Sequence, residues 1–189
     1  RSWRREAESL QRQLAEEAAR LRLRWSFRIA RGRLSAEVDT RAQAFDLVVL
    51  GKRMSIRVRA VAHVPPRMAG IQTQRRVLVL FESDPASLHS LDLGARLARL
   101  NGVELVPLIR AENDAAYQAA CAAARAALEG QGTAGRCARL TTLDGASLVQ
   151  AAHREQAGCL VLADKGRFLN QPGFERMLDE IECPIVLIR

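Results

Sequence analysis

From residue 75 to the end of the chain, short apolar runs alternate with segments whose apolar residues recur at helical spacing. The runs are mostly continuous, which is typical of strands buried on both faces of a sheet. We predict strands at residues 75–81, 103–109, 136–142, 159–163 and 184–188, separated by helices at residues 84–101, 114–128, 146–156 and 174–181. Strict alternation of strand and helix predicts an α/β fold with an open parallel sheet, helices on both faces and right-handed crossovers.

The first of these helices has clear boundary signals. Asp84 is a favourable N-cap residue, and Pro85 follows at the first helical position, where its missing N–H costs nothing. Asn101-Gly102 is a typical helix stop. These signals predict a helix from residue 85 to about residue 101.

The chain also repeats itself. QAFDLVVLGK (43–52) resembles QAGCLVLADK (156–165) at an offset of 113 residues, and the same offset pairs Gly32 with Gly145. A period of this length indicates duplicated domains rather than a solenoid. The offset aligns Arg1 with the middle of the later copy, so we expect the front of the first copy to precede Arg1 or to come from another chain.

The repeat predicts the division of the chain. Residues 1–50 are interpreted as the second half of a first domain, residues 51–75 as a degenerate arm or linker, and residues 76–189 as a complete domain. The first copy is predicted to contain a helix at 3–23, a strand at 24–30, a helix at 33–44 and a strand at 45–50. The helix at 3–23 carries an apolar stripe typical of a packed domain helix, formed by Ala7, Leu10, Leu14, Ala18 and Leu21.

Charge is distributed unevenly. Residues 1–76 contain 18 Lys and Arg against 7 Asp and Glu, a net charge of +11, whereas residues 77–189 carry 11 against 14, a net charge of −3. The basic half could attract nucleic acid, anionic lipid or an acidic protein partner, or could simply be a solvated helix face. Aromatic residues make up 4% of the chain, so stacking on single-stranded nucleic acid is not favoured.

No apolar run approaches the length of a membrane span and no signal peptide is recognisable, so we expect a cytoplasmic protein without a membrane partner. The four cysteines are Cys121, Cys137, Cys159 and Cys183. Their spacing matches no zinc or redox motif, which favours buried, reduced thiols.

Four segments of the later copy, VLVLFES, DGASLVQAA, CLVLADKG and ECPIVLIR, together with FDLVVLGKR in the first copy, resemble the universal stress protein family. The resemblance implies an adenine nucleotide alpha hydrolase-like sheet of five parallel strands in the order 3-2-1-4-5, with Val77–Phe81 at its centre. It also implies pairing of two domains through the last strand, as a homodimer or as a pseudo-dimer within a tandem chain. We therefore expect Ile185–Ile188 to lie at such a contact, with the arm at 51–74 crossing between the halves.

Some members of that family bind ATP through a Gly-x2-Gly-x9-Gly-Ser/Thr run after the fourth strand, where backbone N–H groups surround the phosphates. The run is not preserved here. The family positions are occupied by Asp164, Arg167 and Met177-Leu178 in the later copy, by Gly51, Met54 and Val64-Pro65 in the first copy, and by Glu82 in place of the family's Asp after the first strand. No cofactor is therefore predicted, and ATP is disfavoured because a carboxylate repels a triphosphate.

A different ligand site is predicted from topology. Open α/β sheets bind ligands beyond the carboxyl ends of their central strands. The candidate residues are Glu82, Ser83, Asp164, Lys165 and Gly166, with Gly51 and Lys52 as their counterparts in the first copy. Such a cluster could hold a small cationic or zwitterionic ligand, or could be a solvated group of ion pairs.

Catalysis and metal binding have little support. His63, His89 and His153 have no clustered carboxylates or thiols around them, and no Ser-His-Asp or paired-carboxylate pattern occurs. The leading hypothesis is a non-enzymatic tandem module in stress response or signalling that acts through protein association or a small ligand. The alternatives are a stress protein that binds ATP or AMP with a divergent phosphate loop, and nucleic-acid binding by the basic half.

Overall fold

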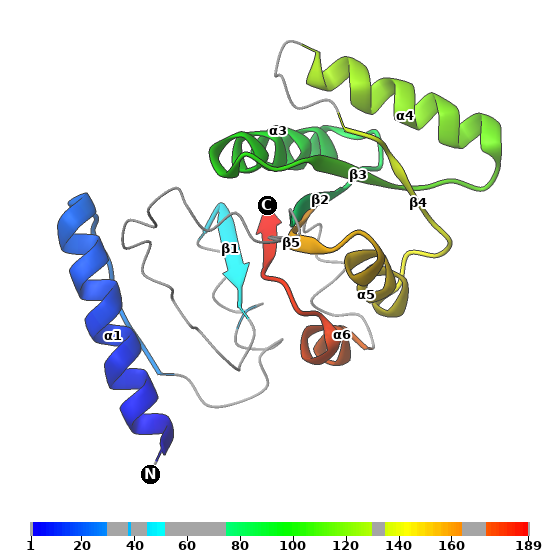
Figure 1. The fold of residues 1–189 in the computed structure, drawn as a ribbon. Helices are drawn as coiled ribbons and strands as arrows, with labels where there is room; N and C mark the ends of the chain where they lie inside the picture. The colour runs from blue at the N-terminus through cyan, green and yellow to red at the C-terminus, as the bar shows by residue number, and fades with distance from the viewer. Residues whose placement is uncertain are drawn as a thin grey trace, which may run out of the picture.

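The computed structural model describes residues 2–29, 38, 45–51, 75–129, 135–163 and 173–188. These residues form a sheet flanked by helices (Figure 1). The strands are β1 (Leu47–Leu50), β2 (Arg76–Leu80), β3 (Leu105–Arg110), β4 (Ala138–Leu140), β5 (Ala157–Ala163) and β6 (Ile185–Ile188). The helices are α1 (Ser2–Leu21), α3 (Pro85–Asn101), α4 (Asp114–Leu128), α5 (Gly145–Arg154) and α6 (Phe174–Glu180).

The sheet has the order β1-β6-β5-β2-β3-β4 within the described residues. Strands β2 to β6 are parallel, and their order is the predicted 3-2-1-4-5 with β2 at the centre. The predicted strand count is wrong by one, because β1 adds a sixth strand antiparallel to β6. The sheet is therefore mixed rather than purely parallel. The added strand pairs with backbone groups of β6 that would otherwise be open at the end of the sheet.

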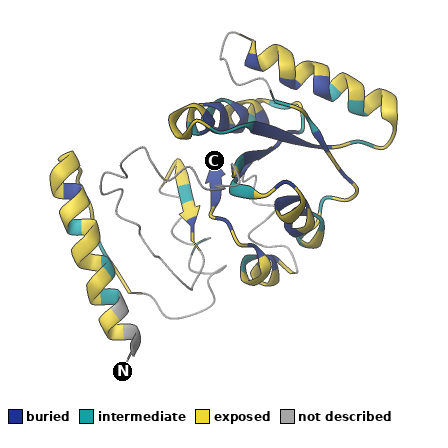
Figure 2. Ribbon diagram, in the orientation of Figure 1, coloured by how far each residue is buried: buried dark blue, intermediate teal, exposed yellow. Residues whose placement is uncertain are grey.

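Helices cover the sheet on both faces, as predicted (Figure 1). Leu78 and Leu80 of β2 belong to a core shared with α5 and α6, whereas Val77 and Val79 belong to a core shared with α3 and α4. All four side chains are at most 4% exposed. Figure 2 shows the same contrast in colour, with buried central strands and mostly exposed outer faces of the helices.

Helix α3 begins and ends at the predicted signals. Asp84 is the N-cap and forms a capping box with Ser87, whose backbone N–H donates to Asp84 Oδ1 at 2.8 Å. Gly102 closes the helix in the left-handed conformation at φ 63°. Within the helix, a Cβ atom on Gly94 would lie 2.3 Å from Val79 Cγ2, so a glycine is required where α3 packs onto β2.

The N-terminal region agrees with the predictions only in part. Helix α1 and strand β1 match the helix expected at 3–23 and the strand expected at 45–50. The strand predicted at 24–30 is wrong as far as it is described, because residues 24–29 adopt no regular structure. No described strand pairs with this segment, and a single strand cannot satisfy its own backbone hydrogen bonds.

Other parts of the repeat prediction fall on positions that are not described. The helix expected at 33–44 is described only at Val38, which is helical and packs against the core beneath α5 and α6. Gly32 and most of the arm at 51–75 lie outside the described residues. The division into an incomplete first domain, a linker and a complete domain therefore stays a prediction.

The apolar stripe of α1 is only partly covered. Ala18 is buried, but Leu14 is 49% exposed and Leu21 is 55% exposed. Most of the helix surface is in contact with solvent (Figure 2). None of the described helices combines the length and the apolar composition that crossing a bilayer would require.

Strand β1 provides a test of its pairing with β6. Leu50 lies opposite Ile185, is 8% exposed and packs into the core, whereas Val49 is 57% exposed on the other face. We expect Leu50→Ala to lower the free energy of unfolding by about 3 kcal/mol, because it leaves a cavity in the core. Val49→Ala should change it by no more than about 0.5 kcal/mol. Urea denaturation measures both, and equal effects would contradict the observed pairing.

Candidate ligand-binding site

The parallel strands β2 to β6 all point in one direction, so the loops that follow them emerge at one end of the sheet, called here its carboxyl end. Glu82 and Ser83 lie at this end, directly after β2. Because β1 runs antiparallel, Gly51 lies at the opposite, amino end, next to the beginning of β6. The structure therefore does not bring Gly51 together with Glu82 and Ser83. The other predicted site residues, Lys52, Asp164, Lys165 and Gly166, lie outside the described residues.

The turn after β2 is tightly constrained. Ser83 is exposed and has φ 61°, a left-handed conformation that costs a non-glycine residue roughly 1–2 kcal/mol. The next residue, Asp84, already caps α3, and its backbone N–H donates to Ser87 Oγ at 3.1 Å. Ser87 is 1% exposed, so the capping box is held by the core. This arrangement fixes the backbone of the loop and directs Glu82 and Ser83 to the carboxyl end of the sheet.

A cavity of about 250 Å³ opens at the same end, beside the neighbouring strands β3 and β4. It is lined by Arg110 at the end of β3, by Ala111 and Glu112 after it, and by Thr141, Thr142 and Leu143 after β4. The pairing of Arg110 with Leu140 brings the two loops together. Sequence reasoning missed this cavity, although its residues follow predicted strands and the rule for carboxyl ends could have identified them.

One wall of the cavity contains an ordered hydroxyl network. Asp144 is the N-cap of α5 and accepts a hydrogen bond from the Ser147 backbone N–H at 2.8 Å. Thr142 Oγ1 lies 2.6 Å from Asp144 Oδ2 and 2.6 Å from Ser147 Oγ. The hydrogen bond from Thr142 and those from the helix backbone lower the pKa of Asp144. Thr142 therefore donates to a carboxylate and accepts from Ser147, which fixes the direction of its hydroxyl.

The neighbouring surface joins α4 to β4. Arg139 forms an ion pair with Asp114 and lies over the ring of Tyr117, 5.5 Å from its centroid. The Tyr117 hydroxyl donates to the Cys137 carbonyl at 3.1 Å, and burial is the main reason that the pKa of Tyr117 rises to about 12. These contacts hold the first turn of α4 against β4, beside the loops that line the cavity.

The amino end of the sheet carries a buried charge cluster. The Glu155 side chain is 3% exposed and pairs with Arg136, with Arg154 at 3.2 Å and with Arg76 at 3.8 Å. Arg76 also pairs with Glu104 at 2.7 Å. A buried carboxylate needs such partners, because an unpaired one would be strongly destabilising. The cluster is therefore explained by its role in joining α5 to β2 and β4.

A second cavity, of about 200 Å³, lies at this amino end. It is lined by Arg75, Ala152, His153, Gln156, Ala157, Glu182 and Cys183. Neither this cavity nor any other described part of the chain contains three His, Cys, Asp or Glu side chains placed to hold a metal ion. Glu82 and Ser83 lie at the opposite end of the sheet, so this cavity is not the predicted site.

All four cysteines are free thiols, with Cys121 and Cys183 buried and Cys137 and Cys159 half-buried. Burial raises the pKa of Cys159 to about 11 and the pKa of Cys183 to about 12. Burial also raises the pKa of Cys137 to about 12, with a contribution from its hydrogen bond with Cys121. Thiols with such pKa values are poor nucleophiles near neutral pH, which favours a structural role.

Comparison with known proteins identifies the fold. No family model and no curated protein matches the chain. Among solved structures, the universal stress protein from Archaeoglobus fulgidus is 16% identical with a TM-score of 0.50, and the match covers 61% of this chain and 93% of that one. Its complex with dAMP is 15% identical with a TM-score of 0.50, over 63% of this chain and 100% of that one.

A universal stress protein in complex with cAMP gives a similar match. It is 16% identical with a TM-score of 0.51, over 61% of this chain and 97% of that one. The matched share corresponds in size to the part of the chain that begins near β2. The chain therefore has the universal stress protein fold, as the resemblance of its sequence implied.

The thiol pKa values predict slow alkylation and an alkaline loss of stability. At pH 8, a thiol with a pKa of about 12 is ionised in roughly one molecule in ten thousand, so iodoacetamide should modify Cys183 of the native chain far more slowly than that of the urea-unfolded chain. The unfolded thiol ionises near pH 8.5 and the folded one does not, so the unfolded state binds fewer protons above that pH. The free energy of unfolding should fall as pH rises above about 9. Equal alkylation rates, measured by mass spectrometry, would contradict the burial of this thiol.

Proposed function

We propose that the chain is a non-enzymatic ligand-binding module that holds a nucleoside monophosphate at the carboxyl end of its sheet. The observation that carries the proposal is the cavity formed by the loops after β3 and β4. It lies at the carboxyl end of the sheet, the end at which open α/β sheets bind ligands, but beside β3 and β4 rather than at the switch in strand order between β2 and β5. Structures of the same fold that are described as complexes with dAMP and cAMP support this class of ligand.

The chemistry of the lining residues suits a ligand with a single phosphate. Arg110 supplies a permanently charged guanidinium that can make paired hydrogen bonds with phosphate oxygens. Glu112, on the same loop, adds a negative charge that would repel a longer phosphate chain. A volume of about 250 Å³ lies slightly below the range of about 300–1,000 Å³ typical of pockets for drug-sized ligands, which also favours a small molecule.

The position of α6 argues against a triphosphate. Met177 and Leu178 occupy the place of the family's Gly-Ser/Thr pair in the sequence. Met177 is 2% exposed within the core, and Leu178 packs against the same core from within α6. Neither residue can supply the exposed backbone or the hydroxyl that phosphate binding by the family run requires. The proposed site therefore relies on the loops after β3 and β4.

Binding of adenosine monophosphate tests the proposal. Titration calorimetry should detect binding to the unmodified chain, with no gain in affinity for ATP. We expect Arg110→Gln to weaken adenosine monophosphate binding roughly ten- to a hundredfold, because it removes a charge-assisted hydrogen bond. The matched control is Arg99→Gln, an equally charged and exposed position on α3, which should bind normally. Absence of binding by the unmodified chain, or equal effects of the two substitutions, would overturn the proposal.

A second candidate function is association through the outer side of β1. This strand is the terminal strand of the described sheet, and its neighbourhood exposes Phe45 by 61%, Leu47 by 41% and Val49 by 57%. Because β6 already pairs with β1, a homodimer through β6 would first have to displace β1. Association through β1 itself requires no such rearrangement.

Sedimentation velocity tests this association. If β1 forms the contact, the unmodified chain should sediment as a dimer, and Val49→Lys should convert it to a monomer by placing a charge in the apolar contact. Leu100→Lys, at a residue that is 83% exposed at the end of α3, serves as the control and should leave the dimer intact. A monomeric unmodified chain would rule out this candidate.

A further inference from the structure

The chain leaves α1 through a segment in which arginine and apolar residues alternate. Residues 20–29 read RLRLRWSFRI, with arginine at 20, 22, 24 and 28 and an apolar side chain at every odd position. We call this the basic–apolar segment. In an extended chain, successive side chains point to opposite sides. Where residues 23–29 are extended, Leu23, Trp25, Phe27 and Ile29 therefore lie on the side opposite to Arg24 and Arg28.

The structure shows how the segment departs from α1. Arg22 adopts a left-handed conformation at φ 53°, and its backbone N–H donates to the Ala19 carbonyl at 3.2 Å. The Leu23 backbone N–H donates to the Ala18 carbonyl at 2.8 Å. This pair of hydrogen bonds is a Schellman motif, which ends the helix at a defined residue. Residues 23–29 then continue without regular structure.

Most of the apolar side of the segment is exposed, and only Phe27 on this side is half-buried. Leu21 is 55% exposed, Leu23 59%, Trp25 43% and Ile29 57%. An exposed apolar patch of this kind in a folded protein marks an interaction surface more often than a single exposed side chain does. The exposed positions are interrupted only by the half-buried Phe27 and include a tryptophan, which is enriched where a protein meets the interface of a bilayer.

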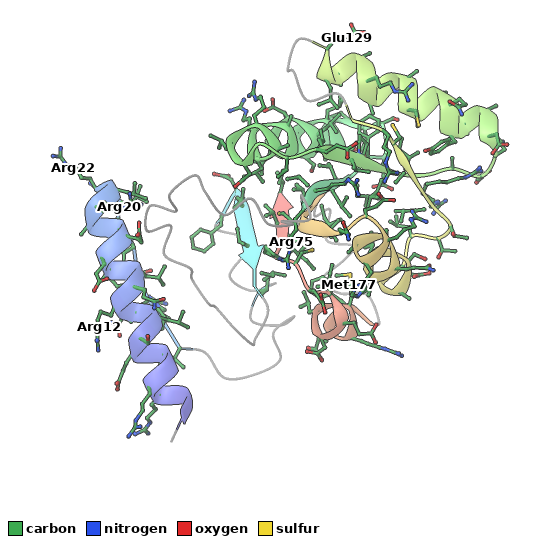
Figure 3. The ribbon with its side chains drawn as sticks, viewed as in Figure 1. Arg12, Arg20, Arg22, Arg75, Glu129 and Met177 are labelled. Atoms are coloured by element: carbon green, nitrogen blue, oxygen red, sulfur yellow. The ribbon has the colours of Figure 1, made fainter. Side chains whose placement is uncertain are left out.

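The charges of the segment have one sign. Residues 18–29 contain four arginines and no acidic residue. Arg20 pairs with Glu17 at 2.6 Å, but within the described part of the chain no carboxylate forms an ion pair with Arg22, Arg24 or Arg28. Figure 3 shows Arg20 and Arg22 at the end of α1, with Arg22 directed away from the rest of the molecule. The segment therefore carries a local positive field beside its apolar residues.

Nucleic acid and a lipid surface are both anionic, but they differ in what they offer to aliphatic side chains. Single-stranded nucleic acid gains from aromatic stacking, to which Leu21, Leu23 and Ile29 cannot contribute. A bilayer surface accepts aliphatic and tryptophan side chains at the boundary of its acyl chains, while arginine side chains reach its head groups. The exposed residues of the segment fit the bilayer better.

We propose that the basic–apolar segment docks on the surface of an anionic lipid bilayer. Leu21, Leu23, Trp25 and Ile29 enter the boundary between head groups and acyl chains, and Arg22, Arg24 and Arg28 bind anionic head groups. This is attachment to a surface and not a span, and it revises the expectation that the chain has no membrane partner. The inference is independent of the proposed ligand site, which shares no residue with the segment.

Co-sedimentation of the full chain with vesicles tests the proposal. Vesicles of phosphatidylcholine alone should bind little protein, whereas vesicles that also contain phosphatidylglycerol should bind it strongly at low salt and weakly at high salt. Equal binding to both kinds of vesicle, or binding to neither, would overturn the proposal. So would binding to a single-stranded oligonucleotide without binding to the anionic vesicles.

Variants locate the binding surface. The triple substitution Arg22→Gln, Arg24→Gln and Arg28→Gln should weaken binding to anionic vesicles about a hundredfold. The matched control, Arg96→Gln, Arg99→Gln and Arg125→Gln, removes the same charge from exposed positions on α3 and α4 and should bind nearly as well as the unmodified chain. An equal loss of vesicle binding in the two triple variants would show that only the net charge of the protein matters, and it would overturn the proposal.

A separate set of variants tests the contribution of the apolar residues to vesicle binding. Leu23→Ser combined with Ile29→Ser should weaken vesicle binding at least tenfold, whereas Leu100→Ser, at an isolated exposed leucine, should not. In a Trp3→Phe variant, in which Trp25 is the remaining tryptophan, the fluorescence should shift to shorter wavelength on anionic vesicles, and in Trp25→Phe the shift should be absent. Circular dichroism of each variant confirms that α1 is intact. An unshifted Trp25 spectrum on vesicle-bound protein would show that the segment is not the contact.

Discussion

Strand β2 has no face in contact with solvent, and this constraint determines most of the fold. Its residues from Val77 to Leu80 are apolar without interruption, so neither side can be left to water. Helices must therefore cover both faces, and parallel connections supply them, since each crossover places one helix on the sheet. Gly94 shows how closely one of them approaches, because a single added methyl group would overlap Val79. The same parallel connections bring the loops that follow β2, β3, β4 and β5 to one end of the sheet.

The two ends of β2 have different surroundings. At its amino end, Arg76 joins the ion pairs around the buried Glu155, which connect the start of β2 to the end of α5. At its carboxyl end, the chain turns at once through Ser83 into the capped start of α3. A strained residue beside a rigid cap is a feature often found where a ligand binds. The ligand site proposed above occupies the loops at this end.

The parts of the fold that the sequence predicts are those that depend on local pattern. Continuous apolar runs located the five parallel strands, and Asp84, Pro85 and Gly102 located both ends of α3. The direction of β1 could not be predicted from local pattern. An apolar run indicates that a strand forms, but it does not indicate which strand pairs with it or in which direction. The strand predicted at residues 24–30 from the repeat is wrong for the same reason, because no described strand pairs with residues 24–29. Pairing depends on contacts between segments distant in sequence, which no local window contains.

The candidate site was likewise predictable only in part. Glu82 and Ser83 were found because they follow a recognisable strand, and topology alone places them at the carboxyl end of the sheet. Arg110, Glu112 and Thr142 also lie at the carboxyl ends of strands, but no sequence motif distinguishes them from other polar loop residues. In the structure, the hydroxyl of Thr142 is fixed by Asp144 and Ser147.

Alternation at residues 22–29 has a consequence that does not depend on strand pairing. Whether or not a neighbouring strand is present, an extended chain separates its odd and even side chains, so the arginines and the apolar residues diverge. Left unpaired at the end of α1, such a segment loses the stability of a sheet but keeps its two chemically distinct sides. The wrong strand prediction and the proposed lipid contact therefore have one physical origin. The alternation of arginine and apolar residues gives the segment two chemically different sides, and the contacts available to the segment determine whether these sides face a neighbouring strand or a lipid surface.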